Sequence, residues 1–384
     1  MKNCLSAPLD VFIAITNKCN LACKHCNVYP TRNSTSDLTT DEWIKFIRRL
    51  AELKVFTLWI SGGEPFMKDD VFSILHEIEK HHFHYGLNTN ATLIDENTSQ
   101  RISALKKLFS VVVSLDGSTP AIHDKQRGKG SFDRTIRGIE NLLKHNRHVS
   151  TYTTVTRYNY HDMEKIIILG KSLGLAAVKF NELLPLGNAV CHLPNLILSN
   201  SQRRAMTREI ERLRDTYENF VIGTILEMSC FFKNFEAQNT IQESKYPKVV
   251  NGLFGCGGGI QKCTIRPDGW VVPCDRLWEF KAGNIRETDF QDIWNSSSIF
   301  SEMRKRSSVS LDEIESCNGC EYKSLCVGGC PAVSYELSGS VFNADPMSCY
   351  RIYKDKGFPY KLDITNSQKE MEGYAREIQI QTPL

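Results

Sequence analysis

Short apolar runs alternate with amphipathic segments through the first half of the chain. The apolar runs have the length of strands and fall at residues 11–16, 56–61, 84–89, 110–115, 149–156 and 177–183. Segments with helical periodicity lie between them, as in TTDEWIKFIRRLAEL and FDRTIRGIENLLKHN. Such repetition implies an α/β fold in which parallel strands are joined by helical crossovers. Six strands are too few for a closed eight-stranded barrel, so we expect a partial (β/α)6 TIM-like barrel, with an open doubly wound sheet as the alternative.

Changes in composition divide the rest of the chain after this α/β domain, which we place at residues 1–198. Residues 199–255 begin as a charged amphipathic helix and continue as a mixed polar stretch, so we expect a bridge between domains. Residues 256–355 are rich in Cys and Gly and their regular elements look short. A small, loop-rich domain of this kind needs metal clusters as staples. Residues 356–384 are expected to form a C-terminal tail.

The overall charge is close to neutral. Lys and Arg number 47 and Asp and Glu number 44, which leaves a net charge of +3. This balance gives no case for nucleic acid or an anionic membrane surface as a partner. The chain lacks the run of about 18 apolar residues that a membrane span requires, and its N-terminus lacks the pattern of a secretory signal. We therefore expect a cytoplasmic protein.

The 14 cysteines are concentrated in a few short segments of the chain. These segments are residues 19–26, 256–274 and 317–349, and their short spacings favour metal binding over disulfides. The first segment has the spacing C-x3-C-x2-C and follows the first apolar run, where parallel α/β folds place their active sites. It indicates either a structural zinc site completed by His25 or a distant cysteine, or a [4Fe–4S] cluster with one open iron.

The segment ISGGEP at residues 60–65 follows the second apolar run. Two glycines at a strand end let a backbone approach a ligand closely, and the Glu64 carboxylate suits an ammonium group. Together with the cysteine triplet one strand–helix unit earlier, this segment resembles the radical S-adenosylmethionine enzymes. The resemblance implies that Cys19, Cys23 and Cys26 hold a [4Fe–4S] cluster. Its open iron would bind the amino and carboxylate groups of S-adenosylmethionine.

The resemblance continues along the following strands. NTNATL (88–93) carries Ala91 where the family's common TNG has Gly, and SLDG (114–117) is followed by IHDKQRG. The cofactor-binding residues implied by the resemblance are Gly62, Gly63, Glu64, Pro65, Asn90, Ser114, Asp116 and Arg127. In this family one electron, here from a donor such as flavodoxin or ferredoxin, cleaves the cofactor. The resulting 5′-deoxyadenosyl radical takes a hydrogen atom from the substrate.

The C-terminal cysteines resemble the SPASM domain, which carries two auxiliary [4Fe–4S] clusters. The matching positions are Cys256, Gly269 and Cys274, then CNGCEYKSLCVGGC at residues 317–330, then Cys349. Cys263 lies outside this seven-cysteine pattern and would supply an eighth thiolate, leaving no open auxiliary iron. By the resemblance, the first cluster is held by Cys256, Cys263, Cys274 and Cys330, and the second by Cys317, Cys320, Cys326 and Cys349. Two structural zinc sites are the alternative, while Cys4, Cys191 and Cys230 fit no spacing.

Two auxiliary clusters suit an oxidation, because they accept or relay the electron that a substrate radical must lose. Asp275 directly follows Cys274 in PCDRLWEF. This segment resembles the anaerobic sulfatase-maturing enzymes, in which an aspartate at this place is assigned as base, and the alternative is a loop carboxylate. Those enzymes favour an aromatic residue before the last cysteine of the triplet, where this chain has His25.

We therefore expect a radical S-adenosylmethionine oxidoreductase with three [4Fe–4S] clusters that oxidises or cross-links a ribosomal precursor peptide (a RiPP maturase). Eighteen residues precede Cys19, so peptide recognition would need a separate protein or the C-terminal tail. One alternative is formylglycine formation in a sulfatase. Another is oxidation of a small molecule such as a sugar, an aminocyclitol or a tetrapyrrole. A structural iron–sulfur or zinc protein is the non-catalytic alternative.

Overall fold

The computed structural model describes residues 5–28, 36–145, 148–225, 252–253, 255–323 and 326–355. Cys4, Cys230 and the tail expected from residue 356 lie outside the described residues. The chain divides into two compact units, the first made of Met1–Leu226 with Gly257–Lys305 and the second of Glu227–Cys256 with Arg306–Leu384. Residues 257–305, which the sequence analysis assigned to the C-terminal domain, thus belong to the first unit.

A single sheet organises the first unit, in the order β10-β9-β8-β1-β2-β3-β4-β5-β6-β7 over the described residues. The strands are β1 Asp10–Ala14, β2 Thr57–Ser61, β3 His84–Thr89, β4 Leu108–Ser114, β5 Val149–Val155, β6 Ala177–Glu182, β7 Val221–Ile225, β8 Lys262–Ile265, β9 Trp270–Val272 and β10 Gly283–Asn284. Strands β1 to β7 pair in parallel in chain order, and β8 pairs in parallel with the free side of β1. The fold is therefore a partial TIM barrel, and the six predicted strands are confirmed. Strands β7 to β10 were not predicted.

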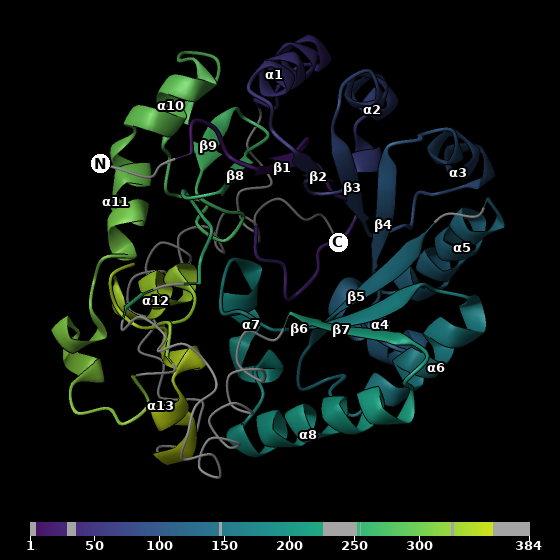
Figure 1. The fold of residues 1–384 in the computed structure, drawn as a ribbon. Coiled ribbons are helices and arrows are strands. Elements are labelled where there is room, and N and C mark those ends of the chain that lie inside the picture. The colour runs from purple at the N-terminus through teal and green to yellow at the C-terminus, as the bar shows by residue number, and fades with distance from the viewer. Residues whose placement is uncertain are drawn as a thin grey trace, which may run out of the picture. The chain divides into compact units, whose positions relative to one another are not determined.

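Helices of the first unit lie on the outer side of the curved sheet, as Figure 1 shows for α1, α2, α3, α5 and α6. The helices of this unit are α1 Thr40–Glu52, α2 Val71–Glu79, α3 Glu96–Ser103, α4 Pro120–Arg127, α5 Ser131–Lys144, α6 Met163–Leu173, α7 Asn188–Leu196, α8 Asn200–Thr216, α10 Phe290–Ser296 and most of α11 Ser298–Arg306. No helix among the described residues is long and apolar enough to cross a membrane.

Alternation along the strands separates an apolar core from the inside of the barrel. Val11 and Ile13 of β1 belong to the large core that the sheet shares with its helices. Phe12 and Ala14, one residue further along in each case, line a cavity inside the barrel. Successive residues of a strand point to opposite faces, so the sheet buries one face under helices and leaves the other for a site.

The second unit is small and has short regular elements. It contains α12 Pro331–Ser338 and α13 Tyr350–Asp355, with 3-10 turns at Leu311–Glu313, Glu315–Cys317 and Pro346–Ser348. Its apolar core contains Leu253, Leu311, Ile314 and Cys317. The buried guanidinium of Arg306 donates to the backbone carbonyls of Leu253, Gly329 and Val341. One cation thus ties together three segments that carry little apolar surface of their own.

Candidate functional site: a thiol-lined cavity in the barrel

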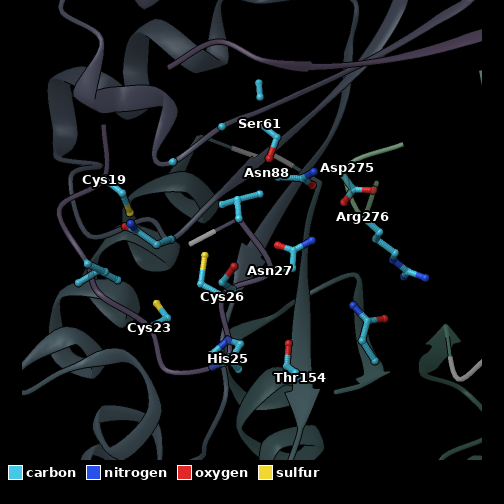
Figure 2. Close-up of a pocket in the computed structure, with 18 of the residues that line it drawn as sticks. Cys19, Cys23, His25, Cys26, Asn27, Ser61, Asn88, Thr154, Asp275 and Arg276 are labelled. Atoms are coloured by element: carbon cyan, nitrogen blue, oxygen red, sulfur yellow. The ribbon is translucent and has the colours of Figure 1, made fainter. Parts of the chain in front are cut away.

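The cysteine triplet lines a cavity of about 310 Å³ at the carboxyl ends of the strands. Figure 2 shows Cys19, Cys23 and Cys26 on one side of it. Each of the strands β1 to β6 and β8 contributes a lining residue near its end, namely Ala14, Ser61, Asn88, Ser114, Thr154, Asn181 and Thr264. The predicted location of the triplet, at the edge where parallel strands end, is therefore confirmed.

Two glycines allow the cysteine loop to pack directly against the end of β2. A Cβ atom on Gly62 would lie 2.7 Å from the Thr16 carbonyl oxygen, and one on Gly63 would lie 2.2 Å from that of Lys18. The backbone N–H groups of Gly63 and Glu64 donate to these same two oxygens, each over 2.8 Å. The close approach expected from the glycine pair is thus made by the cysteine loop itself, which these contacts hold in place.

Glu64 occupies a different position from the one expected of an ammonium-binding carboxylate. Its side chain is buried, and its two oxygens accept hydrogen bonds from Thr89 Oγ1, the Asn90 N–H and the Phe66 N–H. Burial raises its pKa to about 7, against the effect of these donors. The expected contact between this carboxylate and the cofactor's amino group is therefore corrected: Glu64 joins the end of β2 to the end of β3. Pro65 begins a 3-10 turn and is also buried.

Asn90 connects the third strand to the cysteine loop. Its side-chain amide donates to Asn20 Oδ1 over 2.9 Å, and its own oxygen accepts from the Thr92 N–H and hydroxyl. Ala91 adopts a φ of 59°, the left-handed region in which Gly is usual. Ala91 therefore holds a backbone conformation that is strained for a residue with a Cβ atom.

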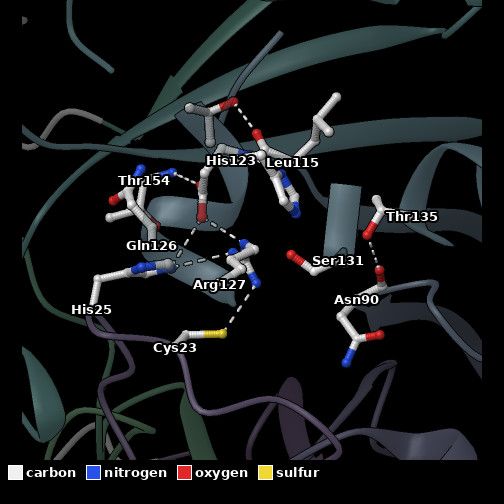
Figure 3. A network of polar contacts seen from close by, with 12 residues as sticks. Cys23, His25, Asn90, Leu115, His123, Gln126, Arg127, Ser131, Thr135 and Thr154 are labelled. Carbon is white, nitrogen blue, oxygen red and sulfur yellow. Dashed lines mark hydrogen bonds and ion pairs between the residues drawn. The ribbon is translucent and has the colours of Figure 1, made fainter. Parts of the chain in front are cut away.

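A buried ion pair lies directly beside the cysteines, and Figure 3 shows Arg127 in contact with both His25 and Cys23. Arg127 Nε donates to Asp116 Oδ2 over 2.5 Å, and Arg127 Nη1 lies 3.8 Å from Cys23 Sγ. His25 Nε2 lies 3.2 Å from both Asp116 Oδ2 and Arg127 Nη2. Burial raises the pKa of Asp116, but Arg127 and His25 outweigh it and hold that pKa below its usual value.

The structure therefore separates the four residues expected to contact the cofactor after β3. Ser114, Asn90 and Arg127 line the cavity. Asp116 is fully buried behind Arg127 and accepts hydrogen bonds from that residue and from the Thr154 N–H. The expectation that Asp116 faces the cofactor is corrected, because its carboxylate is enclosed by protein donors.

Asp275 and Arg276 lie across the cavity from the cysteine triplet, as Figure 2 shows. Both belong to the first unit, in the segment that follows β9, and Trp278 lines the same cavity. The cysteine loop and Asp275 are far apart in the sequence but face one space. That Asp275 acts as a base stays a prediction, and its place in the cavity lining is compatible with that role.

Two residues that hold the cysteine loop were missed by the sequence analysis. Asn188, at the start of α7, donates through its backbone to the Cys26 carbonyl and through its side chain to the Cys23 carbonyl. The Asp37 carboxylate accepts from the Thr16 hydroxyl, and from the backbone N–H and the side-chain amide of Asn17. The available signal was weak: Asn188 is a polar residue five positions after the end of the predicted strand at residues 177–183.

Four of the C-terminal cysteines line one pocket in the second unit: Cys317, Cys320, Cys326 and Cys349. The Gly328 N–H donates to Cys326 Sγ over 3.4 Å, a contact that suits a thiolate ligand. Cys256 and Cys330 both lie close enough to Arg306 to interact with its charge. The structure thus brings together the four thiols expected to hold the second auxiliary cluster.

Cys263 does not share this setting. It lies on β8, is fully buried, and belongs to the apolar core with Val11 and Ile265. Its neighbour Thr264 is the residue that lines the cavity, so the Cys263 side chain points to the opposite face of the sheet. Burial alone raises the pKa of this thiol far above its usual value. The expected eighth ligand is corrected, because this thiol is enclosed by apolar side chains.

The thiols of the first unit suit the cluster that the sequence motifs imply. Three thiols from one loop open into one cavity, which matches the three-cysteine ligation of a [4Fe–4S] cluster with a vacant iron position. The glycine pair leaves no room for side chains between that loop and β2. Burial raises the pKa of Cys23 to about 11 while Arg127 opposes that rise, so metal binding must displace a proton there.

Known proteins match the chain over nearly its whole length. Residues 13–169 match the model of the Radical SAM superfamily, and residues 256–321 match SPASM, an iron–sulfur cluster-binding domain. AdoMet-dependent heme synthase of Methanosarcina barkeri is 31% identical over 358 residues, which cover 90% of this chain and 97% of that protein. The chain belongs to the radical SAM superfamily. It is a radical SAM enzyme with a SPASM domain, and S-adenosylmethionine and [4Fe–4S] clusters are typical of such enzymes.

Other similar proteins include peptide-modifying enzymes. Mycofactocin maturase MftC of Mycolicibacterium smegmatis is 28% identical, over 89% of this radical SAM chain and 83% of the maturase. The structure of Streptococcus suis SuiB bound to precursor peptide SuiA matches with a TM-score of 0.73 at 19% identity, over 90% of this chain and 76% of SuiB. Native anSMEcpe with bound AdoMet matches with a TM-score of 0.66 at 22% identity, over 97% of this chain and 100% of that chain. At these identities the two structures show a shared fold.

Proposed function

We propose that this radical SAM enzyme oxidises a side chain of a tetrapyrrole, in a reaction of the heme-synthesis type. One observation carries the proposal: the match to AdoMet-dependent heme synthase is 31% identical and covers 97% of that protein, so both units take part in it. Fe-coproporphyrin III synthase of Methanosarcina barkeri is 25% identical over 355 residues. A tetrapyrrole was among the alternatives from the sequence, and these similarities favour it over the peptide hypothesis stated first.

Residues on the two sides of the cavity would have different roles. Cys19, Cys23 and Cys26 would hold the cluster that, with S-adenosylmethionine, supplies a 5′-deoxyadenosyl radical. Arg276 lines the same cavity, and its planar guanidinium suits a substrate carboxylate such as a porphyrin propionate. The substrate hydrogen atom would go to the 5′-deoxyadenosyl radical, and the ionised carboxylate of the propionate would leave as carbon dioxide, with one electron for the auxiliary clusters to accept. Asp275 would therefore act as a base only in the peptide or formylglycine reactions, where the oxidation releases a proton.

The test is a single-turnover reaction of the anaerobically reconstituted enzyme with dithionite, S-adenosylmethionine and Fe-coproporphyrin III. We expect 5′-deoxyadenosine to form together with a porphyrin in which a propionate has become a vinyl group, seen by mass spectrometry as loss of carbon dioxide and two hydrogens. A variant with Cys19, Cys23 and Cys26 all changed to Ala is the control and should form neither product. If the parent forms 5′-deoxyadenosine while the porphyrin is recovered unchanged, the tetrapyrrole proposal is wrong.

Modification of a ribosomal precursor peptide is the second candidate function. It is supported by the 28% identity to mycofactocin maturase MftC over 89% of this chain. The same assay with a precursor peptide from a neighbouring gene separates the candidates, because the peptide then changes mass and the porphyrin does not. Formylglycine formation is supported only by the fold shared with anSMEcpe.

A further inference from the structure

The guanidinium of Arg127 is held in one position by groups of the protein itself. Its Nε donates to Asp116 Oδ2 over 2.5 Å, and its Nη2 lies 3.2 Å from His25 Nε2. Its remaining Nη1 lies 3.8 Å from Cys23 Sγ, within the range of a hydrogen bond to sulfur. Arg127 and Asp116 are both buried, with 8% and 0% of their surfaces exposed. A guanidinium fixed in this way has one donor group directed at a cluster ligand.

Asp116 is itself held by groups other than Arg127. Its Oδ1 accepts from the Thr154 N–H of β5, its backbone N–H donates to His123 Nδ1 on α4, and its backbone carbonyl accepts from the side-chain amide of Asn159. Since β5 anchors the carboxylate independently of α4, we infer that Asp116 fixes the position of Arg127. Arg127 sits at the last position of α4, and Gly128 follows it with a φ of 107°. The helix therefore ends where the guanidinium reaches the cysteine loop.

We propose that Arg127 raises the reduction potential of the cluster at Cys19, Cys23 and Cys26, and that Asp116 positions it and limits the rise. Hydrogen bonds to cluster sulfurs and nearby charges set such potentials. A cation beside a thiolate favours the reduced cluster, which carries one more negative charge, and an anion opposes it. The two charges are therefore expected to act in opposite directions on one property.

The two charges differ in their contact with the cluster ligand. Arg127 Nη1 lies 3.8 Å from Cys23 Sγ, whereas the Asp116 carboxylate contacts the guanidinium of Arg127. The inference uses the family assignment and is independent of which substrate the enzyme oxidises. It also differs from the carboxylate contact that family resemblance implied for Arg127, because all three guanidinium nitrogens already have neighbours within the protein.

The experiment is a redox titration of the full-length reconstituted enzyme without S-adenosylmethionine, followed by electron paramagnetic resonance. The cluster signal is identified in parallel samples as the one that changes when the cofactor is added. Arg127→Gln is expected to lower the potential, because the Asp116 anion is then unopposed. Asp116→Asn is expected to raise it. At a fixed solution potential, each change should alter the ratio of reduced to oxidised cluster by about tenfold or more, which is about 59 mV for one electron.

A matched control is available in another buried pair of the first unit. Arg266 pairs with Asp268 over 2.8 Å, and both are buried. Arg266→Gln should leave the potential unchanged. Arg127→Lys keeps the charge, so its reduction potential should fall between those of the parent and Arg127→Gln. If Arg127→Gln does not load a cluster, the potentials of Arg127→Lys and Asp116→Asn decide the result. The proposal is overturned if the Arg127 and Asp116 variants move the potential in the same direction, or no further than Arg266→Gln does. It is equally overturned if Arg127→Gln weakens cofactor binding while the potential stays at the parental value.

Discussion

Single buried groups in this enzyme have protonation states that differ between the folded and the unfolded chain. Glu64 is the clearest case, since its carboxylate is buried while three donors point at it. The ordinary pKa of 4.5 is raised to about 7 by burial. The folded chain therefore holds a proton on Glu64 over a pH range in which the unfolded chain has lost it.

This difference predicts a pH dependence of stability. From about pH 4.5 to about pH 7 the folded state binds one proton more than the unfolded state, so stability falls as the pH rises through this window. The size is up to about 3 kcal/mol. Thermal unfolding of the parent and of Glu64→Gln should be compared across the window, because Gln cannot titrate. The parent should lose stability relative to the variant as the pH rises, and parallel profiles would contradict the raised pKa.

A second prediction at this scale concerns Cys263. Its side chain lies in the apolar core on β8, so Cys263→Val replaces one small apolar group by another of similar size. We expect the reconstituted variant to keep the iron and sulfide content of the parent. Cys274→Ala is the paired variant, and it should lose iron if Cys274 is a ligand. A fall in iron content for Cys263→Val would return Cys263 to the ligand set.

At the scale of elements, packing inside the barrel depends on one position without a side chain. Gly86 of β3 lies beside Trp59 of β2, and a Cβ atom on Gly86 would come within 2.3 Å of the indole ring. That ring also packs against Phe12, with centroids 6.0 Å apart, and against Phe109 at 5.3 Å. The indole therefore has little freedom to move away. Its position affects the packing of β1, β3 and β4, which carry Phe12, Gly86 and Phe109.

Gly86→Ala is accordingly expected to destabilise the first unit by about 1–3 kcal/mol, the usual cost of overpacking. Gly223→Ala is the matched control on β7, because a Cβ atom there meets the flexible side chain of Lys179. The control should cost clearly less. Thermal or denaturant unfolding of both variants measures the difference, and equal costs would show that the indole can move aside.

Sequence reasoning located the elements and motifs whose signal is local. The six strands were recognised from runs of apolar residues, and the cysteine loop and the glycine pair from their spacing. It missed β8, because Lys262–Ile265 is four residues long and lies among cysteines and glycines that were assigned to another domain. It also misjudged the side chains of Glu64, Asp116 and Cys263, because whether a side chain faces a cavity, a partner or the core depends on contacts with residues distant in the sequence.

At the scale of the whole molecule, the two units differ in what stabilises them. The first has a continuous apolar core, whereas the core of the second contains Leu253, Leu311, Ile314 and Cys317, with a few partly buried apolar neighbours. Four thiols line one pocket in the second unit. Because the core that the described residues of this unit form is small and contributes little, the stability of the unit is expected to depend on the metal cluster that these thiols would hold.

Cys320→Ser is therefore expected to make the second unit sensitive to protease while the first stays resistant. Limited proteolysis of the reconstituted parent and variant, with mass analysis of the fragments, locates the new cleavage sites. Cys191→Ser is the control, because Cys191 is exposed on α7 and fits no ligand pattern. Equal resistance of Cys320→Ser and the parent would mean that Cys320 is not a structural ligand.

The place of β8 in the sheet has a consequence for the order of events during synthesis. Strand β1 pairs with β2 on one side, but its partner on the other side, β8, is formed by Lys262–Ile265 and is synthesised much later. At ordinary rates of translation the ribosome needs on the order of ten seconds or more to pass from one to the other. Throughout that interval the backbone groups on one side of β1 have no partner strand in the growing chain. This unpaired edge lies directly before the loop that carries Cys19. A chain stopped short of residue 262 would keep that edge open.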